Sequence, residues 1–370
     1  MSTNLPSEHP SEDHFEGLYV ADLGEQQLLQ RVQRFCPANL VGDDAAVLIP
    51  RAGYSLVVTA DMLVDGVHFA TGYAATGCVT TEQGATGQDT PGKCTTSPQD
   101  VGWRGTAANL SDLAAMGAQP LGITVSLGLP PTTPVQWLDE LYEGITGCLS
   151  LYQAPILGGD LCRSPILTLS ITALGEVLLG QQFLRSTAQV GDAIVVTGVH
   201  GASRAGLELL LNPEWGQDLS PQAQSLLKRA HQRPTPRLDV PPLLRQLDPT
   251  ARITGMDSSD GLADAVLQIC RASGVGARLN RDRLPIPEVL RATQSLSEQT
   301  LIHWVLYGGE DFELILCLPQ PLAEALVSQL GQQAVIIGKI VTDPTVRLVD
   351  EGGQSLGAPL SLEQGFQHFS

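Results

Sequence analysis

Apolar segments of strand length alternate with amphipathic segments of helical length along most of this chain, and that alternation constrains the fold more than any other feature. Residues 55–63 (SLVVTADML), 122–130 (GITVSLGLP) and 192–198 (DAIVVTG) are typical of short buried strands. Residues 101–120 and 133–153 have the composition and spacing of helices. The alternation predicts α/β or α+β architecture, and 370 residues suffice for two or more domains of this kind.

Two changes in composition suggest how the chain is divided. Residues 1–16 are polar and acidic, which predicts a flexible tail. Residues 70–100 are rich in Thr, Gly and Gln without any period, which predicts an insertion loop. We therefore expect an N-terminal domain over residues 17–185, containing this insertion, and a C-terminal α/β domain over residues 186–370.

The charge balance excludes some classes of partner. Asp and Glu number 39 against 21 Lys and Arg, so the formal net charge is -18. Nucleic-acid binding depends on cationic side chains and is not expected. The seven cysteines include no C-x-x-C pair, and we find neither a signal peptide nor a membrane span. These features predict a cytoplasmic protein.

Aspartates recur where apolar segments meet Gly, Ser or Thr. Asp43 and Asp44 lie together inside the apolar stretch LVGDDAAVLIP, which has no Lys or Arg. Two charges about 5 Å apart repel by about 3 kcal/mol at an effective dielectric near 20, so a cation, solvent or a metal must offset the repulsion. A single Gly-Asp pair is most often a turn, but recurrence at strand ends favours Mg²⁺ held by carboxylates and substrate phosphates.

The stretch ITGMDSSDGLADAVLQI, residues 253–269, is the most informative of these. Asp257 and Asp260 precede a predicted helix that begins near Gly261, with Ser258 or Ser259 as its expected cap. Free amides at a helix N-terminus favour anions, so this stretch fits a metal-phosphate site, although an ordinary cap explains it equally well. Phosphate-binding P-loop, Rossmann and protein-kinase motifs are absent from the sequence.

Six motifs, in order, resemble the thiamine-monophosphate kinase family, a branch of the aminoimidazole ribonucleotide synthetase-like ATP-binding superfamily. They are GDDAAVL, TADMLVDGVHF, NLSDLAAMGAQP, GGDL, DSSDGL and YGGEDFEL. The resemblance implies a two-domain α/β (α+β) fold whose N-terminal domain has a mixed sheet and dimerises. It also implies Mg²⁺-dependent transfer of a phosphoryl group from ATP to thiamine monophosphate, giving thiamine diphosphate.

The resemblance also implies roles for individual residues. ATP would contact Gly159, Asp160, Arg185 and Ser259, and thiamine monophosphate would contact His68 and Glu310. The implied metal ligands are Asp44, Asp61, Asp112, Asp160, Asp257 and Asp260. Residue 60 is Ala where the family usually has a hydroxyl group, so Thr59 is expected to supply that contact. Glu363 stands where some relatives have a substrate-contacting aromatic residue, and Phe366 is the nearby candidate.

The acceptor in this reaction needs neither a nucleophilic side chain nor a general base. A phosphate monoester is already ionised near neutral pH, so the obstacle is bringing two anionic groups together. We therefore expect direct in-line transfer without a phospho-enzyme. The alternatives are a sister enzyme, of the aminoimidazole ribonucleotide synthetase, selenophosphate synthetase or hydrogenase-maturation dehydratase type, or a non-catalytic relative that binds nucleotide and metal.

Overall fold

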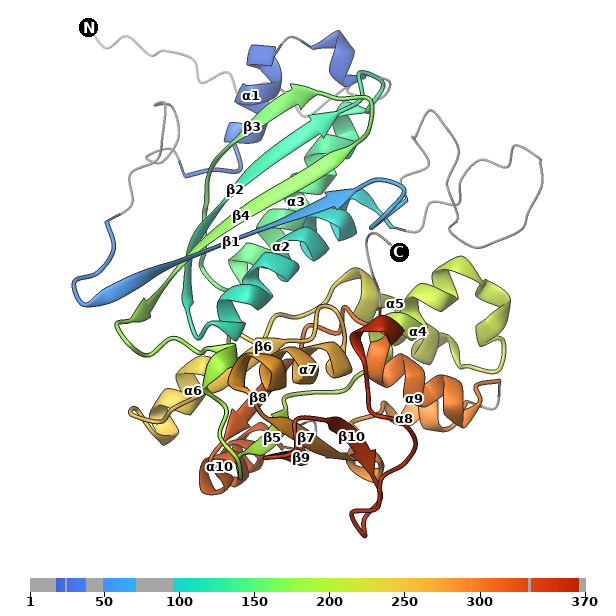
Figure 1. The fold of residues 1–370 in the computed structure, drawn as a ribbon. Coiled ribbons are helices and arrows are strands. Elements are labelled where there is room, and N and C mark those ends of the chain that lie inside the picture. The colour runs from blue at the N-terminus through green and yellow to red at the C-terminus, as the bar shows by residue number, and fades with distance from the viewer. Residues whose placement is uncertain are drawn as a thin grey trace, which may run out of the picture.

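The structure is a computed structural model that describes residues 18–23, 25–37, 49–70, 96–293, 295–331 and 334–365 (Figure 1). The predicted tail, the Asp43–Asp44 pair and Phe366 lie outside these residues, as does 71–95 of the predicted insertion. Residues 96–100 do not belong to an insertion, because Ser97 caps the helix α2 (Pro98–Ala115) that starts there. The 70–100 boundary is corrected accordingly.

The N-terminal half contains a mixed four-stranded sheet in the order β1-β4-β2-β3, as the resemblance implied. Its strands are β1 (Tyr54–Val64), β2 (Gln119–Leu129), β3 (Ile156–Arg163) and β4 (Thr168–Leu178). Only β2 and β3 run parallel; the other neighbours are antiparallel. Gly158 and Gly159 lie inside β3. The close approach of β3 to β2 requires glycine at position 159, because a Cβ atom there would meet the backbone of Val125.

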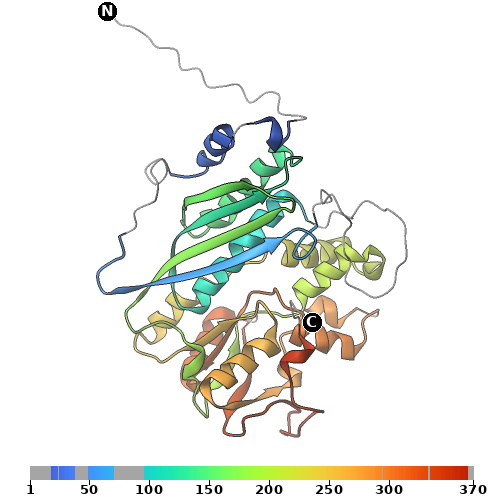
Figure 2. The same cartoon turned by 45° about the horizontal axis from the view of Figure 1, so that its top comes forward.

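Helices cover one face of this sheet. Figures 1 and 2 show α2 and α3 (Val135–Ser150) on that side, with α1 (Glu25–Gln33) beside α3. The helices α2 and α3 cross closely, since a Cβ atom at Gly102 would lie 2.1 Å from the Leu141 carbonyl oxygen. The opposite face of β1 exposes Leu56, Val58 and Met62, whose relative exposures are 48%, 57% and 56%.

The C-terminal half contains a six-stranded sheet in the order β10-β7-β9-β5-β8-β6. Its strands are β5 (Ala193–Val196), β6 (Thr254–Asp257), β7 (Gly276–Asn280), β8 (Leu314–Leu318), β9 (Val335–Val341) and β10 (Val346–Val349). Its helices are α4 (Ala202–Leu211), α5 (Pro221–Gln232), α6 (Val240–Leu247), α7 (Leu262–Ser273), α8 (Glu288–Arg291), α9 (Glu298–Tyr307) and α10 (Gln320–Leu330).

Both faces of this second sheet are buried. Ile194 and Val196 pack in one core with α4, α7 and α9, whereas Ala193 and Val195 pack in another with α6 and α10. This explains why β5 reads as a continuous apolar run rather than an alternating one. Ala114 and Ala115, at the end of α2, also belong to the second core, so the two halves share apolar packing. Among the described residues, no helix is both long enough and apolar enough to cross a bilayer.

Candidate active site

Four aspartates gather where the two halves meet. Asp61 lies on the helix-facing side of β1, Asp112 on α2, Asp257 at the end of β6, and Asp260 in the loop before α7. The Ser111 hydroxyl donates to Asp257 Oδ2 at 2.8 Å, which is a direct hydrogen bond between the halves. Sequence motifs about 200 residues apart thus form one acidic cluster, although only Asp257 lies at the end of a strand.

Hydroxyl and amide groups orient these carboxylates. Thr59 Oγ1 donates to Asp112 Oδ2 at 2.5 Å, and Asn109 Oδ1 accepts from the Asp61 backbone amide at 3.2 Å. Thr59 and Asp61 share one face of β1, whereas Ala60 faces outward. The hydroxyl group on the side of the aspartates is therefore that of Thr59. Asn109 was missed, although it precedes Asp112 by three residues and therefore lies on the same face of α2.

Three aspartates of the cluster have raised pKa values, as expected where negative charges outnumber positive ones. Burial raises the pKa of Asp61 to about 6, and the charges of Asp112 and Asp260 add to this effect. Burial also raises the pKa of Asp257 to about 7, with further contributions from Asp112 and Asp61. The pKa of Asp112 is likewise raised by burial, against the opposing effects of Thr59 and Arg185. A bound cation would favour the ionised form of all these groups.

Arg185 and Ser259 lie at this cluster, as the resemblance implied for ATP contacts. Ser259 Oγ donates to Asp257 Oδ1 at 3.1 Å. Arg185 is close enough to lower the pKa of Asp112, and it donates to Gln268 Oε1 at 2.8 Å. Neither Ser258 nor Ser259 caps α7, contrary to expectation, because Gly261 with a φ of 110° is the N-cap residue. The Ser258 hydroxyl accepts from the Glu313 amide instead, and the Ser259 hydroxyl is used by Asp257.

Within one chain, Asp160 lies away from the acidic cluster. Strand register aligns Asp160 with Ser126, Ser126 with Ser170, and Ser170 with Met62, so their side chains share one face of the sheet. This is the exposed face, opposite the one on which Asp61 lies. Gly159 packs so tightly that a Cβ atom there would lie 1.8 Å from the Val125 carbonyl oxygen.

Among the described residues, no group of three or more His, Cys, Asp and Glu side chains is arranged as a ready metal-binding site. Asp44, which the resemblance places among the ligands, is outside those residues. The described donors still fit Mg²⁺, because this ion retains several waters and needs only one or two carboxylates together with substrate phosphates.

A second polar group links the predicted substrate contacts. Arg104, on α2, donates to the His68 carbonyl oxygen at 2.6 Å and forms an ion pair with Glu310. Burial alone would raise the pKa of Glu310, but Arg104 together with His231 and His68 outweighs it, and the net shift is downward. His231 Nδ1 lies 3.5 Å from Glu310 Oε2. Burial lowers the pKa of His231 to about 3, so this contact joins a neutral imidazole to the carboxylate.

Sequence reasoning assigned no role to Arg104 or His231. No local motif marks His231, because it reaches the site through the packing of α5 against α4. The His68 ring accepts a hydrogen bond from the Val64 backbone amide at Nδ1, at 3.1 Å. That acceptor role leaves Nε2 as the ring nitrogen that carries the proton.

Glu310 lies in a strained loop over residues 308–313. Glu310 and Phe312 are non-glycine residues with positive φ, at 59° and 52°, each costing about 1 to 3 kcal/mol. Asp311 holds the loop by accepting from the backbone amides of Gly201 and Ser203 at 2.7 and 2.8 Å. Such strain persists only where surrounding contacts over-determine the conformation.

Comparison with known proteins places this fold and site in a class. Residues 42–177 match the AIR synthase related protein N-terminal domain, and residues 189–351 match the C-terminal domain of the same family. A structure of hydrogenase maturation protein HypE shares the fold, with a TM-score of 0.65 at 18% identity. The chain is therefore a two-domain protein of the AIR synthase-related class.

Within that class, sequence identity selects one family. The thiamine-monophosphate kinase of Synechococcus elongatus is 50% identical over 95% of this chain and 98% of its own length. That of Escherichia coli is 33% identical over 89% and 91%, respectively. The crystal structure of the Stenotrophomonas maltophilia thiamine-monophosphate kinase superposes with a TM-score of 0.70 at 32% identity, covering 90% of this chain and 96% of that one. The chain belongs to the thiamine-monophosphate kinase family.

A further structure, named AaThiL complexed with AMPPCP and TMP, is 27% identical with a TM-score of 0.65, and the match covers 91% of this chain and 96% of that one.

Proposed function

We propose that this protein transfers the γ-phosphoryl group of ATP to thiamine monophosphate, giving ADP and thiamine diphosphate in a Mg²⁺-dependent reaction. Family membership gives this activity its main support. The structural observation that carries it is the meeting of Asp61, Asp112, Asp257 and Asp260 between the two halves. The raised pKa values of Asp61, Asp112 and Asp257 suit a cluster completed by divalent cations and an anionic nucleotide.

In this proposal Asp61, Asp112, Asp257 and Asp260 hold Mg²⁺, together with Thr59 and Asp44. Mg²⁺, when bound, would neutralise phosphate charge and allow two anionic groups to approach. The chain itself orients the carboxylates through Thr59, Ser111 and Ser259. Arg185 supplies a permanent positive charge beside them, which fits a contact with the nucleotide phosphates.

The acceptor site is proposed at the second polar group. His68, Glu310 and Phe366 would bind thiamine monophosphate, and Arg104 fixes the relative positions of His68 and Glu310. Glu310 stays ionised beside Arg104, so it suits the positively charged thiazolium ring of the acceptor. The relative named as complexed with AMPPCP and TMP supports a protein that takes both ligands.

We propose that transfer is direct and in line, with the phosphate oxygen of the acceptor as nucleophile. The acceptor phosphate is ionised near neutral pH, so abstraction of a proton is unnecessary. Positioning and charge neutralisation then provide the catalysis. Inversion at a chiral γ-phosphate supports this proposal; retention, or a labelled protein after incubation with ATP alone, refutes it.

We also propose a homodimer that shares the exposed face of the N-terminal sheet. Leu56, Val58 and Met62 on β1 leave an apolar strip uncovered, and Asp160 and Gly159 belong to the same sheet. A second copy over this face would bury the strip. Asp160 would then act on ATP or metal only within that assembly, since one chain places it away from the acidic cluster.

Turnover of the purified protein tests the assignment. Protein, ATP and Mg²⁺ are incubated with thiamine monophosphate, thiamine, selenide or formylglycinamidine ribonucleotide, and ADP and thiamine diphosphate are measured. Thiamine diphosphate formation from the monophosphate alone is expected. Turnover of another acceptor would favour a sister enzyme, and nucleotide binding without turnover would favour a non-catalytic relative.

A cytoplasmic location remains a prediction. Of the seven cysteines, Cys36, Cys148, Cys162, Cys270 and Cys317 lie in the described part of the chain, and all five are free thiols there. Free thiols are typical of a reducing compartment.

A further inference from the structure

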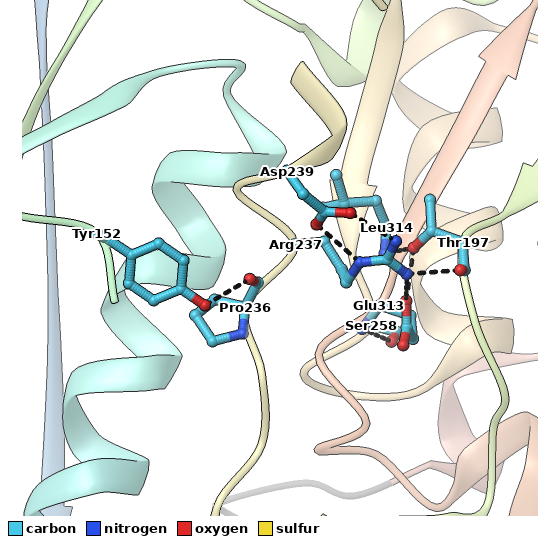
Figure 3. A network of polar contacts seen from close by, with 8 residues as sticks. All are labelled: Tyr152, Thr197, Pro236, Arg237, Asp239, Ser258, Glu313 and Leu314. Atoms are coloured by element: carbon cyan, nitrogen blue, oxygen red, sulfur yellow. Dashed lines mark hydrogen bonds and ion pairs between the residues drawn. The ribbon is translucent and has the colours of Figure 1, made fainter. Parts of the chain in front are cut away.

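Residues 233–239 (RPTPRLD) cross between the two halves, and we call this segment the strap. The N-terminal half holds its first part by hydrogen bonds to the backbone. Trp103 Nε1 donates to the Pro234 carbonyl oxygen at 2.9 Å, and the Tyr152 hydroxyl donates to that of Pro236 at 3.0 Å (Figure 3). Arg233 also forms an ion pair with Asp100 on α2. The strap is thus fixed over four residues to α2 and to the turn that follows α3.

Arg237, the next residue, joins the strap to the C-terminal half (Figure 3). Its Nη1 donates to the Thr197 carbonyl oxygen at 2.5 Å and to Glu313 Oε2 at 2.7 Å. Its other nitrogens bind Asp239 at 3.0 and 2.9 Å. The side chains of Arg237 and Glu313 are 13% and 17% exposed, so the pair is largely shielded from water. Gly198 leaves room for the Glu313 carboxylate, which lies 2.1 Å from where a Cβ atom would be.

Glu313 ends the strained loop, and the backbone around it is paired with the metal-site loop. The Ser258 amide donates to the Glu313 carbonyl oxygen at 2.9 Å, and the Glu313 amide donates to Ser258 Oγ at 3.1 Å. The Glu310 amide donates to the Ser259 carbonyl oxygen at 2.7 Å. We call this pairing of residues 258–259 with 310–313 the clasp. It connects Asp257 and Ser259 to Glu310.

We propose that Arg237 is a positioning residue for phosphoryl transfer: through Glu313 it fixes the clasp, and through the strap it fixes the clasp relative to α2 and α3. This inference rests on the proposed function, which gives Ser259 to ATP and Glu310 to the acceptor. Asp61, Asp112 and Arg104 come from the N-terminal half, whereas Asp257 and Glu310 come from the clasp side. The strap therefore sets the spacing between the two sets of groups.

The chemistry of Arg237 explains why lysine is a severe replacement. A guanidinium group can bind Thr197, Glu313 and Asp239 at once, because its donors lie in a fixed plane. A lysine ammonium group is a single point charge and cannot span these three acceptors. Misplacement of a reacting group by about 1 Å costs about 100-fold in rate, so even a small movement of the clasp is measurable.

The experiment compares Arg237→Lys with Arg31→Lys, a matched control. Arg31 pairs with Asp139 between α1 and α3, with exposures of 14% and 13%, and α1 is distant from the clasp. The kcat and the KM values for ATP and thiamine monophosphate are measured at a temperature well below the unfolding midpoint of each protein. Hydrogen exchange is followed at the Glu310 and Glu313 amides. Arg237→Lys is expected to lower kcat by about 10- to 100-fold and to accelerate exchange at both amides. Arg31→Lys should change neither kcat nor these amides.

Glu313→Gln provides a second variant, because it removes the charge and keeps the shape. It should lower kcat in the same direction, with faster exchange at Glu310. A folded Arg237→Lys or Glu313→Gln protein with kcat within about twofold of the parent and unchanged exchange overturns the proposal. Failure of the parent protein to make thiamine diphosphate would instead refute the proposed function, while the exchange data would still decide whether Arg237 holds the clasp.

Discussion

Replacement of Asp257 by asparagine should stabilise the metal-free protein while removing its activity. Asp257 is 2% exposed and lies beside Asp112 and Asp61, and no Lys or Arg of the described residues forms an ion pair with it. Burial is the main cause of its raised pKa, about 7 against an ordinary value near 3.9. Holding the carboxylate ionised at pH 8 without metal therefore costs about 4 kcal/mol, at 1.36 kcal/mol for each pKa unit.

Only part of that cost should be recovered in the variant. Protonation of a neighbouring carboxyl already relieves some of the repulsion, and asparagine replaces one of two acceptor oxygens that Ser111 and Ser259 use. We expect a gain of about 2 kcal/mol, since a lost hydrogen bond costs about 1 kcal/mol. For a unit of about 150 to 250 residues, this raises the unfolding midpoint by about 4 to 8 °C.

The pH dependence has a definite sign. The pKa of Asp257 is higher in the folded than in the unfolded chain, so the folded protein binds more protons between about pH 4 and pH 7. The free energy of unfolding of the metal-free protein should therefore fall as pH rises through this window, and the fall should be smaller in Asp257→Asn. Scanning calorimetry from pH 5 to pH 8 in EDTA measures both effects.

Mg²⁺ and a matched variant complete the test. Mg²⁺ should raise the midpoint of the parent more than that of Asp257→Asn, and kcat should fall by about 100-fold in the variant. Asp192 is also buried but pairs with Arg252 at 2.8 Å, so Asp192→Asn should lower the midpoint under the same conditions. A lower midpoint for Asp257→Asn in EDTA at pH 8 would refute the reasoning.

Three other changes test separate parts of the site and assembly. Arg104→Gln should raise the KM for thiamine monophosphate and lower the free energy of unfolding by about 3 to 5 kcal/mol, because Glu310 loses its buried partner. Arg104→Lys should partly restore both values. An unchanged KM in Arg104→Gln would contradict the proposed role of Arg104. Val58→Asp should convert a dimer to a monomer in light scattering, unless the exposed face is not the interface. A short Gly/Ser linker in place of residues 71–95 should preserve kcat, whereas lost activity in a folded variant would show that the segment is required.

Much of the fold was predictable from local sequence, because period and composition report burial directly. The strand β1 and the helix α2 were expected from such patterns, and the structure confirms them. The recurrent aspartates of the sequence include the four of the acidic cluster, although Asp112 lies on a helix rather than at a strand end. Helix capping near Gly261 was mispredicted, since the Ser258 hydroxyl accepts from the distant Glu313 amide and the Ser259 hydroxyl donates to Asp257 instead.

Contacts that depend on packing between distant segments could not be predicted. His231 and Arg237 are ordinary helix and loop residues in sequence, and their partners lie in the Glu310–Glu313 segment more than 70 residues away. The face on which Asp160 lies depends on strand register, and a register shift precedes it in the pairing of β2 with β3. A shift of one residue reverses which side chains face the helices, so sequence alone does not determine that face.

Because the acidic cluster lies between the two halves, other contacts are needed to hold the halves together. Mutual repulsion among Asp61, Asp112 and Asp257 acts across the boundary between the halves and opposes their contact. The Ser111–Asp257 hydrogen bond and the apolar contact of Ala114 with the second core act in the other direction. A cation bound between the halves would turn the repulsion into attraction, so ligand binding and interdomain contact should strengthen each other.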